Sequence, residues 1–313
     1  MAKYVVKRVL MALLTVLVVA CITFFLMNAI PGNPWLSDKT PSPQVLENLN
    51  RKYGLDQPVH IQLVKYLGNL SRLDLGVSIK MQKNYPVINI IKEMFPVSAK
   101  IGGFALLWAI LVGVPLGCVA AYNRGNAVDS VLRVICTVGI SLPSFVVAAL
   151  LSFLFCGGLP NMKIFPTMFD GTWQSYILPC FALGFYPMCY ISRQSRAAML
   201  DAINQEYIKT ARAKGLRTGK VIFKHALRNA LIPVITYLGP QVAFTLSGGF
   251  VVEKVFNIPG LGRYFVQSIQ NRDYPVIMGT TIFLATFIVM MNLVVDLLYK
   301  VVDPRINLTK GGK

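Results

Sequence analysis

Six long apolar stretches divide this sequence, and they constrain its fold more than any other feature. A helix rises about 1.5 Å per residue, so about 20 residues cross the roughly 30 Å hydrocarbon core of a bilayer. Backbone polar groups find no partner in lipid, so such a stretch must be helical there. The sequence predicts an all-α, polytopic membrane protein with six transmembrane helices, at residues 9–30, 101–122, 130–155, 176–192, 232–252 and 276–302.

Positive charge is distributed unevenly around these stretches. The formal net charge is +18, although only 14% of residues are charged. The termini and short loops on the side of both chain ends hold 17 Lys and Arg, against four in the short loops on the other side. Because short cytoplasmic loops are enriched in Lys and Arg, we expect both termini to be cytoplasmic. No aromatic-and-basic motif accompanies the charge, so we expect no nucleic acid partner.

The first apolar stretch resembles a signal peptide, because cations precede an apolar run in both. Here the run continues through Cys21 to Met27, where a processed chain should turn polar. We therefore expect an uncleaved first span.

A long polar insertion, residues 31–97, separates the first two stretches. Ser42 and Gly54 mark the start and end of one expected helix, residues 58–70 form a second, and residues 86–94 form an interfacial helix leading into the membrane. Connections of this length usually carry structure of their own. We expect a small external subdomain.

Glycine and proline are placed to shape three of the spans. Gly113 and Gly117 form a G-x-x-x-G pattern, which allows close approach of a second helix. Pro143 predicts a kink in the third span, and the pair Gly239-Pro240 predicts a hinge in the fifth.

The connection between the fourth and fifth stretches, residues 193–231, is the most basic part of the chain. It holds nine cations and two acids. Leu200, Ile203, Tyr207 and Ala211 have helical spacing, and Gly215 predicts the end of that helix. The cations either act only as a topological signal or form a docking surface for a cytoplasmic partner.

Residues for catalysis or metal binding are not apparent. The six cysteines have no zinc or disulfide spacing, and the two histidines are far apart. Residues 215–220 lack the spacing of a phosphate-binding loop. Asp296 is a carboxylate within the sixth stretch and a candidate functional group; the alternative is an inner-leaflet cap or a partner for Arg305. We expect no catalytic residue, no metal and no cofactor bound by this chain.

Several short motifs together resemble one family. Residues 211–215 are followed by Ile232-Pro233, as in the cytoplasmic "EAA" loop of ATP-binding-cassette importer permeases, although Lys209-Thr210-Ala211 replaces Glu-Ala-Ala. That departure, and the order of the other motifs, resemble the oligopeptide and dipeptide branch, and most closely its B-type subunit. The other motifs lie at residues 31–34, 95–100, 141–145, 259–262, 271–275 and 303–306.

The resemblance implies a type I (MetI-like) permease domain over residues 1–313, with residues 193–231 as the coupling loop. It implies a bacterial cytoplasmic membrane, a second homologous permease subunit, an external peptide-binding protein, and two cytoplasmic ATPases that alone bind ATP and Mg²⁺. The implied function is import of oligopeptides or dipeptides. The residues implied in coupling are Glu206, Tyr207, Ala211, Arg212, Lys214, Gly215 and Arg217.

The sequence leaves alternatives open for the cargo and for the class of transport protein. The same architecture could import nickel chelates or glutathione. A protein of another class, a channel or secondary transporter acting alone, is disfavoured because few ionisable residues lie in the spans. Polar residues near the kinks of the third and fifth spans are candidates for the cargo path or, equally, for helix–helix hydrogen bonds: Ser141, Ser144, Gln241, Thr245 and Ser247.

Overall fold

The computed structural model describes residues 2–29, 44, 47, 56–157, 164–217, 219, 221, 226–247 and 249–302. These residues are mostly helical, and within them the one β-type pairing is an isolated bridge between Val77 and Pro86. The expected helix at residues 42–54 and the side chains of Asp296 and Arg305 lie outside the described part. The helices are α1 (Ala2–Ala29), α3 (Val59–Ser71), α4 (Val87–Tyr122), α5 (Ala127–Ser141), α6 (Ser144–Phe155), α7 (Trp173–Ile203), α8 (Glu206–Ala213), α10 (Leu227–Leu246), α11 (Phe250–Val255), α12 (Leu261–Asn271) and α13 (Tyr274–Val302).

The predicted all-α, polytopic membrane class is confirmed. Five spans in the described residues are long and apolar enough to cross a bilayer, and α5 with α6 gives a sixth if that bent pair counts as one. The expected kink in the third span is in fact a bend of 103°. Leu142 is extended there, with φ −86° and ψ 123°, as the residue before a proline prefers.

Helix α4 corrects the prediction of a separate interfacial helix at residues 86–94. It is one helix of 36 residues that passes through Pro96 and Pro115. Ile90 and Ile91 are buried in one cluster with Leu261 of α12 and Val276 of α13. We infer that this packing offsets the hydrogen bond lost at Pro96.

Helices α4 and α7 form the centre of the molecule. A Cβ atom at Gly117 would lie 2.5 Å from the carbonyl oxygen of Ser192, and one at Gly113 would lie 2.7 Å from that of Met188. The close approach predicted from the G-x-x-x-G pattern is therefore confirmed. Helix α7 extends past the predicted end at residue 192, because Met199 continues its buried face.

In the second half of the chain, the fifth span predicted at residues 232–252 is confirmed as the candidate span Pro233–Val255, which contains α10 and the short α11. Helix α12 was not predicted; it lies against α11 and α13. The predicted helix at 58–70 corresponds to α3 and is confirmed.

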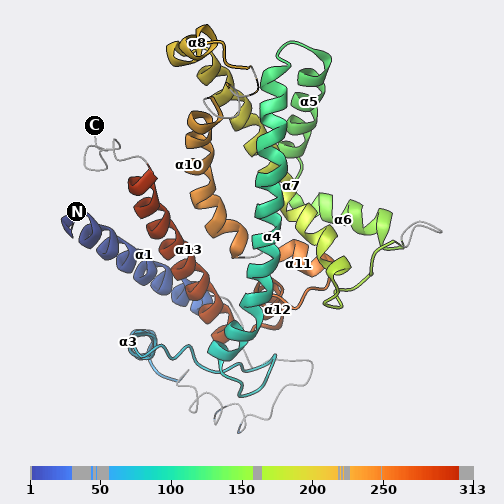
Figure 1. Cartoon of the computed structure of the whole chain (residues 1–313). Coiled ribbons are helices and arrows are strands. Elements are labelled where there is room, and N and C mark those ends of the chain that lie inside the picture. Colours follow the sequence, from blue (N-terminus) through green and yellow to red (C-terminus); the bar gives the residue numbers. More distant parts are fainter. Residues whose placement is uncertain are drawn as a thin grey trace.

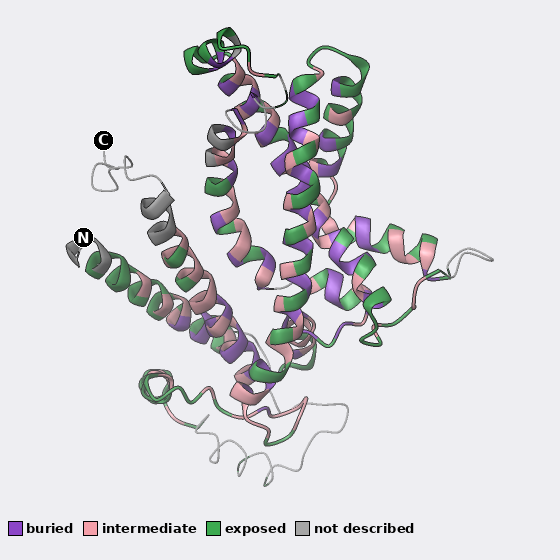
Figure 2. Ribbon diagram, in the orientation of Figure 1, coloured by how far each residue is buried: buried purple, intermediate pink, exposed green. Residues whose placement is uncertain are grey.

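Figure 1 shows how these elements are distributed along the molecule. Helices α3 and α12 lie at one end, α8 lies at the opposite end, and the two termini lie near each other at the left. Figure 2 shows that α1 is exposed over much of its length. The exposed side chains include Leu10, Leu13 and Leu14, which suits a helix surrounded by lipid.

Candidate functional site

Helix α8 lies between α7 and α10 in sequence and forms one tip of the molecule (Figure 1). Its Ile208 is fully buried and its Ala211 is 7% exposed, in a cluster with Met199 of α7 and Val221. The single helix predicted through Leu200 and Ala211 is interrupted, because α7 ends at Ile203 and α8 begins at Glu206. Ala211 thus packs against the chain itself and is not on a face offered to a partner.

Further coupling candidates lie on the exposed side of α8 or just after its end. Tyr207 is 38% exposed, and Lys214 and Arg217 are exposed. Glu206 is also exposed and pairs with Lys209 at 2.7 Å. The side chain of Arg212 lies outside the described part of the chain. These exposed groups form an aromatic and largely cationic surface, while the opposite side of α8 is buried through Ile208 and Ala211.

Gly215 ends α8 in the way that the sequence predicts. Its φ is +73°, and the amide of Leu216 donates to the carbonyl of Ala211 at 3.4 Å. This is the long bond of a Schellman motif, which satisfies a carbonyl at a helix end. The left-handed φ favours glycine, although a Cβ there would meet nothing within 4 Å.

A buried ion pair near the α8 end ties α5 to α7. Asp129 is 1% exposed and accepts two hydrogen bonds from the guanidinium of Arg196, at 2.7 and 2.8 Å. The amide of Gly125 also donates to Asp129, at 3.1 Å. Sequence reasoning placed Asp129 in a short loop and missed this role, because the partner is 67 residues away.

The five path candidates do not come together on one open surface. Ser141 is exposed and donates to Thr137 of its own helix at 3.0 Å, and Ser144 is half-buried just after the bend. Thr245 is 1% exposed and lies beside Gly102 of α4, so it lines no open route in this structure. The side chain of Gln241 is half-buried and donates a hydrogen bond to the hydroxyl of Thr245 at 2.9 Å. Ser247 is 5% exposed, and its hydroxyl donates to the carbonyl of Phe244 at 2.7 Å.

At the opposite end, Asp273 fastens the insertion to the start of α13. Its fully buried carboxylate accepts hydrogen bonds from the hydroxyl of Ser78 at 2.6 Å and from the amides of Ile79, Lys80 and Met81 at 3.0 to 3.1 Å. Four donors compensate the cost of burying this charge. The sequence contains Asp273 within a recognised motif but gives no sign of its partners.

Glu253 holds α11 against the start of α12. It is 2% exposed and accepts from the amide of Arg263 at 3.0 Å. The hydroxyl of Ser98 on α4 accepts from the neighbouring amide of Leu261 at 2.9 Å. Three helices therefore meet here through polar contacts that the sequence analysis missed, since Glu253 lies just beyond the expected span at residues 232–252 and belongs to no motif.

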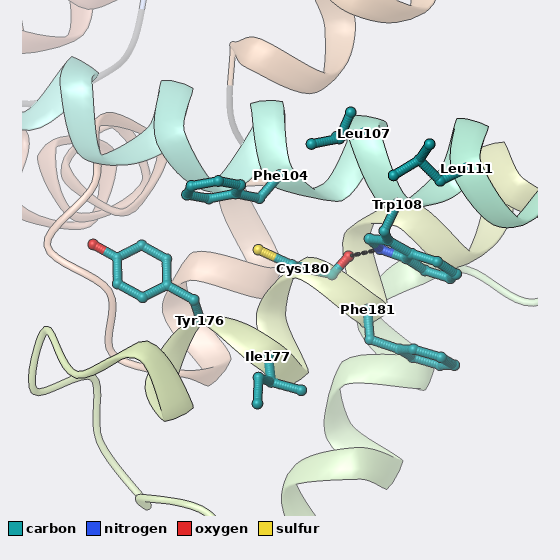
Figure 3. A pocket seen from close by; sticks show the side chains of 8 residues that line it. All are labelled: Phe104, Leu107, Trp108, Leu111, Tyr176, Ile177, Cys180 and Phe181. Carbon is teal, nitrogen blue, oxygen red and sulfur yellow. Dashed lines mark hydrogen bonds between the residues drawn. The ribbon is translucent and has the colours of Figure 1, made fainter.

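An apolar groove of about 380 Å³ lies between α4 and α7 (Figure 3). The indole of Trp108 donates to the carbonyl of Cys180 at 2.7 Å and stacks on Phe181. Phe104 and Leu107, at the groove's edge, are more than half exposed. Its side chains offer almost no polar partner, so the groove suits hydrocarbon and not a peptide backbone.

Taken together, the spans, the tip at α8 and the anchored insertion define a polytopic membrane protein with specialised surfaces at both ends. Residues 113–308 match the family described as binding-protein-dependent transport system inner membrane component. Residues 1–101 match the N-terminal segment described for such membrane components. The chain belongs to this family, and the resemblance identified from its motifs is confirmed.

Individual relatives are similar over their whole length. The dipeptide transport system permease protein DppB of Bacillus subtilis is 44% identical over 315 residues, covering 100% of both chains. The oligopeptide transport system permease protein OppB of Haemophilus influenzae is 39% identical, covering 98% of this chain and 99% of its own. OppB of Salmonella typhimurium is 36% identical, with the same coverage.

Proposed function

We propose that this chain is a permease subunit of an ATP-driven importer of oligopeptides or dipeptides. Its full-length similarity to dipeptide and oligopeptide permeases supports the cargo class. In the proposal, it forms the translocation path with a second, homologous permease in a bacterial cytoplasmic membrane. Both termini and α8 lie in the cytoplasm, and the insertion receives cargo from an external peptide-binding protein.

The observation that carries this proposal is that α8 is packed against the core on one side and exposed on the other. Ile208 and Ala211 fix the helix to the core beside Met199 of α7, while Tyr207 and Lys214 remain exposed. A partner that pushes on such a helix moves α7, because the two are packed together. We assign that partner role to a cytoplasmic ATPase, with two ATPases per transporter.

The proposed docking surface at α8 is cationic, which determines the kind of partner group that it can bind. The exposed cations Lys214 and Arg217 favour acidic groups on the ATPase, and Tyr207 supplies an apolar anchor with a polar end. We expect ATP and Mg²⁺ to bind the ATPases and no cofactor to bind this chain. ATP hydrolysis is thereby assigned to the partners.

The experiment is purification of the native complex from membranes, followed by uptake assays in vesicles. We expect a second permease and ATPases to accompany this chain, and ATP-dependent uptake of labelled dipeptides or tetrapeptides when the binding protein is added. Uptake of glutathione or a nickel chelate in place of peptides would change the cargo assignment. Uptake by the isolated chain without ATPases would refute the proposal in favour of a channel or secondary transporter.

A further inference from the structure

A stripe of polar aromatic side chains runs between α7 and α10. The rings of Tyr186 and Tyr190 stack at 6.4 Å between centroids, and Tyr190 stacks on Tyr237 of α10 at 4.0 Å. The hydroxyl of Tyr237 donates to Gln241 at 3.0 Å. The guanidinium of Arg193 lies over the ring of Tyr190 at 5.6 Å. These five residues, the tyrosine stripe, combine aromatic area with hydrogen-bonding groups.

The stripe is partly open at the surface of this chain. Tyr186 is 37% exposed, Arg193 is exposed, and the other three members are half-buried. Polar groups on membrane helices almost always face the interior of the protein or a water-filled cavity, because lipid offers them no partner. The exposed edge of the stripe is therefore suited to an aqueous route and not to lipid.

Other exposed faces of the spans have a different composition. On α4, Phe104, Leu107 and Leu111 are each more than half exposed. They border the apolar groove of Figure 3, on the α4–α7 side. The contrast indicates that α7 presents one face to hydrocarbon and another to a polar medium.

Arg193 differs from its neighbour Arg196 in its pairing. Arg196 is held by Asp129 through two hydrogen bonds. Within the described part of the chain, Arg193 forms no ion pair with a carboxylate, and its guanidinium lies over the face of Tyr190. A guanidinium binds carboxylates in a bidentate manner, so Arg193 retains its capacity for an anionic ligand.

We propose that the tyrosine stripe lines the cargo route and that Arg193 contacts the α-carboxylate of a passing peptide; this deepens the proposed function and rests on it. Cargo side chains vary in charge, but every unmodified peptide ends in a carboxylate. A fixed cation can therefore guide cargo of any sequence. The tyrosine rings and hydroxyls, with Gln241, offer stacking and hydrogen bonds to side chains and backbone, as ligand sites commonly do.

The first test measures whether water reaches the stripe. Tyr186→Cys and Leu107→Cys are each introduced into the complete transporter, in membrane fragments open on both sides, and treated with a charged thiol reagent. Labelling is compared with the parent chain to subtract its native cysteines. We expect Cys at 186 to react well above Cys at 107, and peptide with its binding protein and ATP to slow that reaction. Equal, background labelling at both positions would place the stripe in a dry interface and overturn the proposal.

The second test addresses Arg193. Uptake of a neutral tripeptide is compared with uptake of its C-terminal amide, with the same binding protein throughout, so that a change in the ratio reports the permease. A charge-assisted hydrogen bond contributes about 1.5–3 kcal/mol, so Arg193→Gln should reduce the preference for the free carboxylate by at least about tenfold. Arg193→Lys should retain part of it. An unchanged ratio in Arg193→Gln, with normal assembly, would remove Arg193 from the route.

The two tests separate this inference from the broader proposal. If the wild-type complex imported no peptide, the assignment of cargo would fail, yet labelling at position 186 would still decide whether the stripe faces water. If peptide import is normal and the labelling is at background, only the assignment of the stripe fails.

Discussion

At the end of α8, a single glycine fixes where the coupling helix stops. Gly215 has a φ of +73°, and the space around it is open. A side chain there is therefore limited by the backbone conformation and not by a clash. For a residue other than glycine, the left-handed conformation costs about 1–2 kcal/mol, and less for Asn.

We expect Gly215→Val to reduce ATP-coupled peptide uptake strongly, because the strained turn shifts the end of α8, and Gly215→Asn to be much milder. Uptake, stimulated ATPase activity and the amount of assembled complex are measured together. Gly171→Val is the matched control, since Gly171 also has a positive φ, +80°, in open space, but lies in the connection before α7. Equal losses in the two Val variants would show that strain alone, and not its position, causes the defect.

Asp273 is the second residue for which the structure predicts a specific phenotype. Asp273→Asn places an amide N–H₂ group among backbone donors, so at least one buried partner loses its acceptor, at a cost of about 1–3 kcal/mol. We expect the segment at residues 76–86 to become more sensitive to protease added from the outside, while membrane insertion is normal.

The matched control is Asp74→Asn, because the exposed Asp74 accepts a local hydrogen bond from the amide of Gly76, two residues away. Protease sensitivity of the two variants is compared by mass spectrometry of the released fragments. If Asp74→Asn loosens the segment as much as Asp273→Asn does, the long-range contact does not hold the insertion.

Individual elements differ in how they are attached to the core. Helix α8 has Ile208 fully buried, whereas α3 has no buried residue. Helix α3 contacts α1 through Tyr66, whose ring stacks on Phe24 at 5.7 Å. Its Val64 is 69% exposed. A weakly attached external helix with exposed apolar groups suits a surface that receives another protein.

Removal of residues 57–73 should therefore reduce peptide uptake more than it reduces assembly with the ATPases. The deletion leaves Ser78 and the anchor at Asp273 in place. The point variant Val64→Glu, which keeps the helix, should lower uptake in the same direction by opposing contact with the binding protein. Co-purification and vesicle uptake are the measurements, and full uptake by the assembled deletion variant would contradict a receiving role for α3.

For the whole molecule, orientation in the membrane is the property that all other assignments depend on. Helices α3 and α8 lie at opposite ends (Figure 1). The cation distribution predicts that the α8 end is cytoplasmic. A polytopic protein of this kind has only two possible orientations, so labelling from one side distinguishes them.

A cysteine introduced at Gln62 of α3 should react with an impermeant maleimide added to intact cells, whereas one introduced at Thr218 should react only after permeabilisation. The reason is that the two positions are expected on opposite sides of the bilayer. The parent chain without an introduced cysteine serves as background. Labelling at 218 from outside would reverse the orientation and, with it, the assignment of α8 to an ATPase.

The local pattern of residues determined the class of this protein and most of its helices. Apolar length specified the spans, the G-x-x-x-G pattern predicted the close approach of α4 and α7, and Gly215 predicted the end of α8. These features could be predicted because each depends on neighbours in sequence: helix rise, transfer of side chains to lipid, and the backbone preferences of glycine.

Tertiary structure alone decided which polar residues act together and which helices continue or break. Asp129 meets Arg196, Asp273 meets Ser78, and Tyr190 meets Tyr237 across long sequence separations. The same packing buries Ala211, which the pattern placed on a docking face, and Thr245, which the pattern offered to the cargo path or, equally, to helix–helix hydrogen bonds. A buried polar group needs a partner whose position depends on the packing of other helices, and a one-dimensional pattern does not contain that distance.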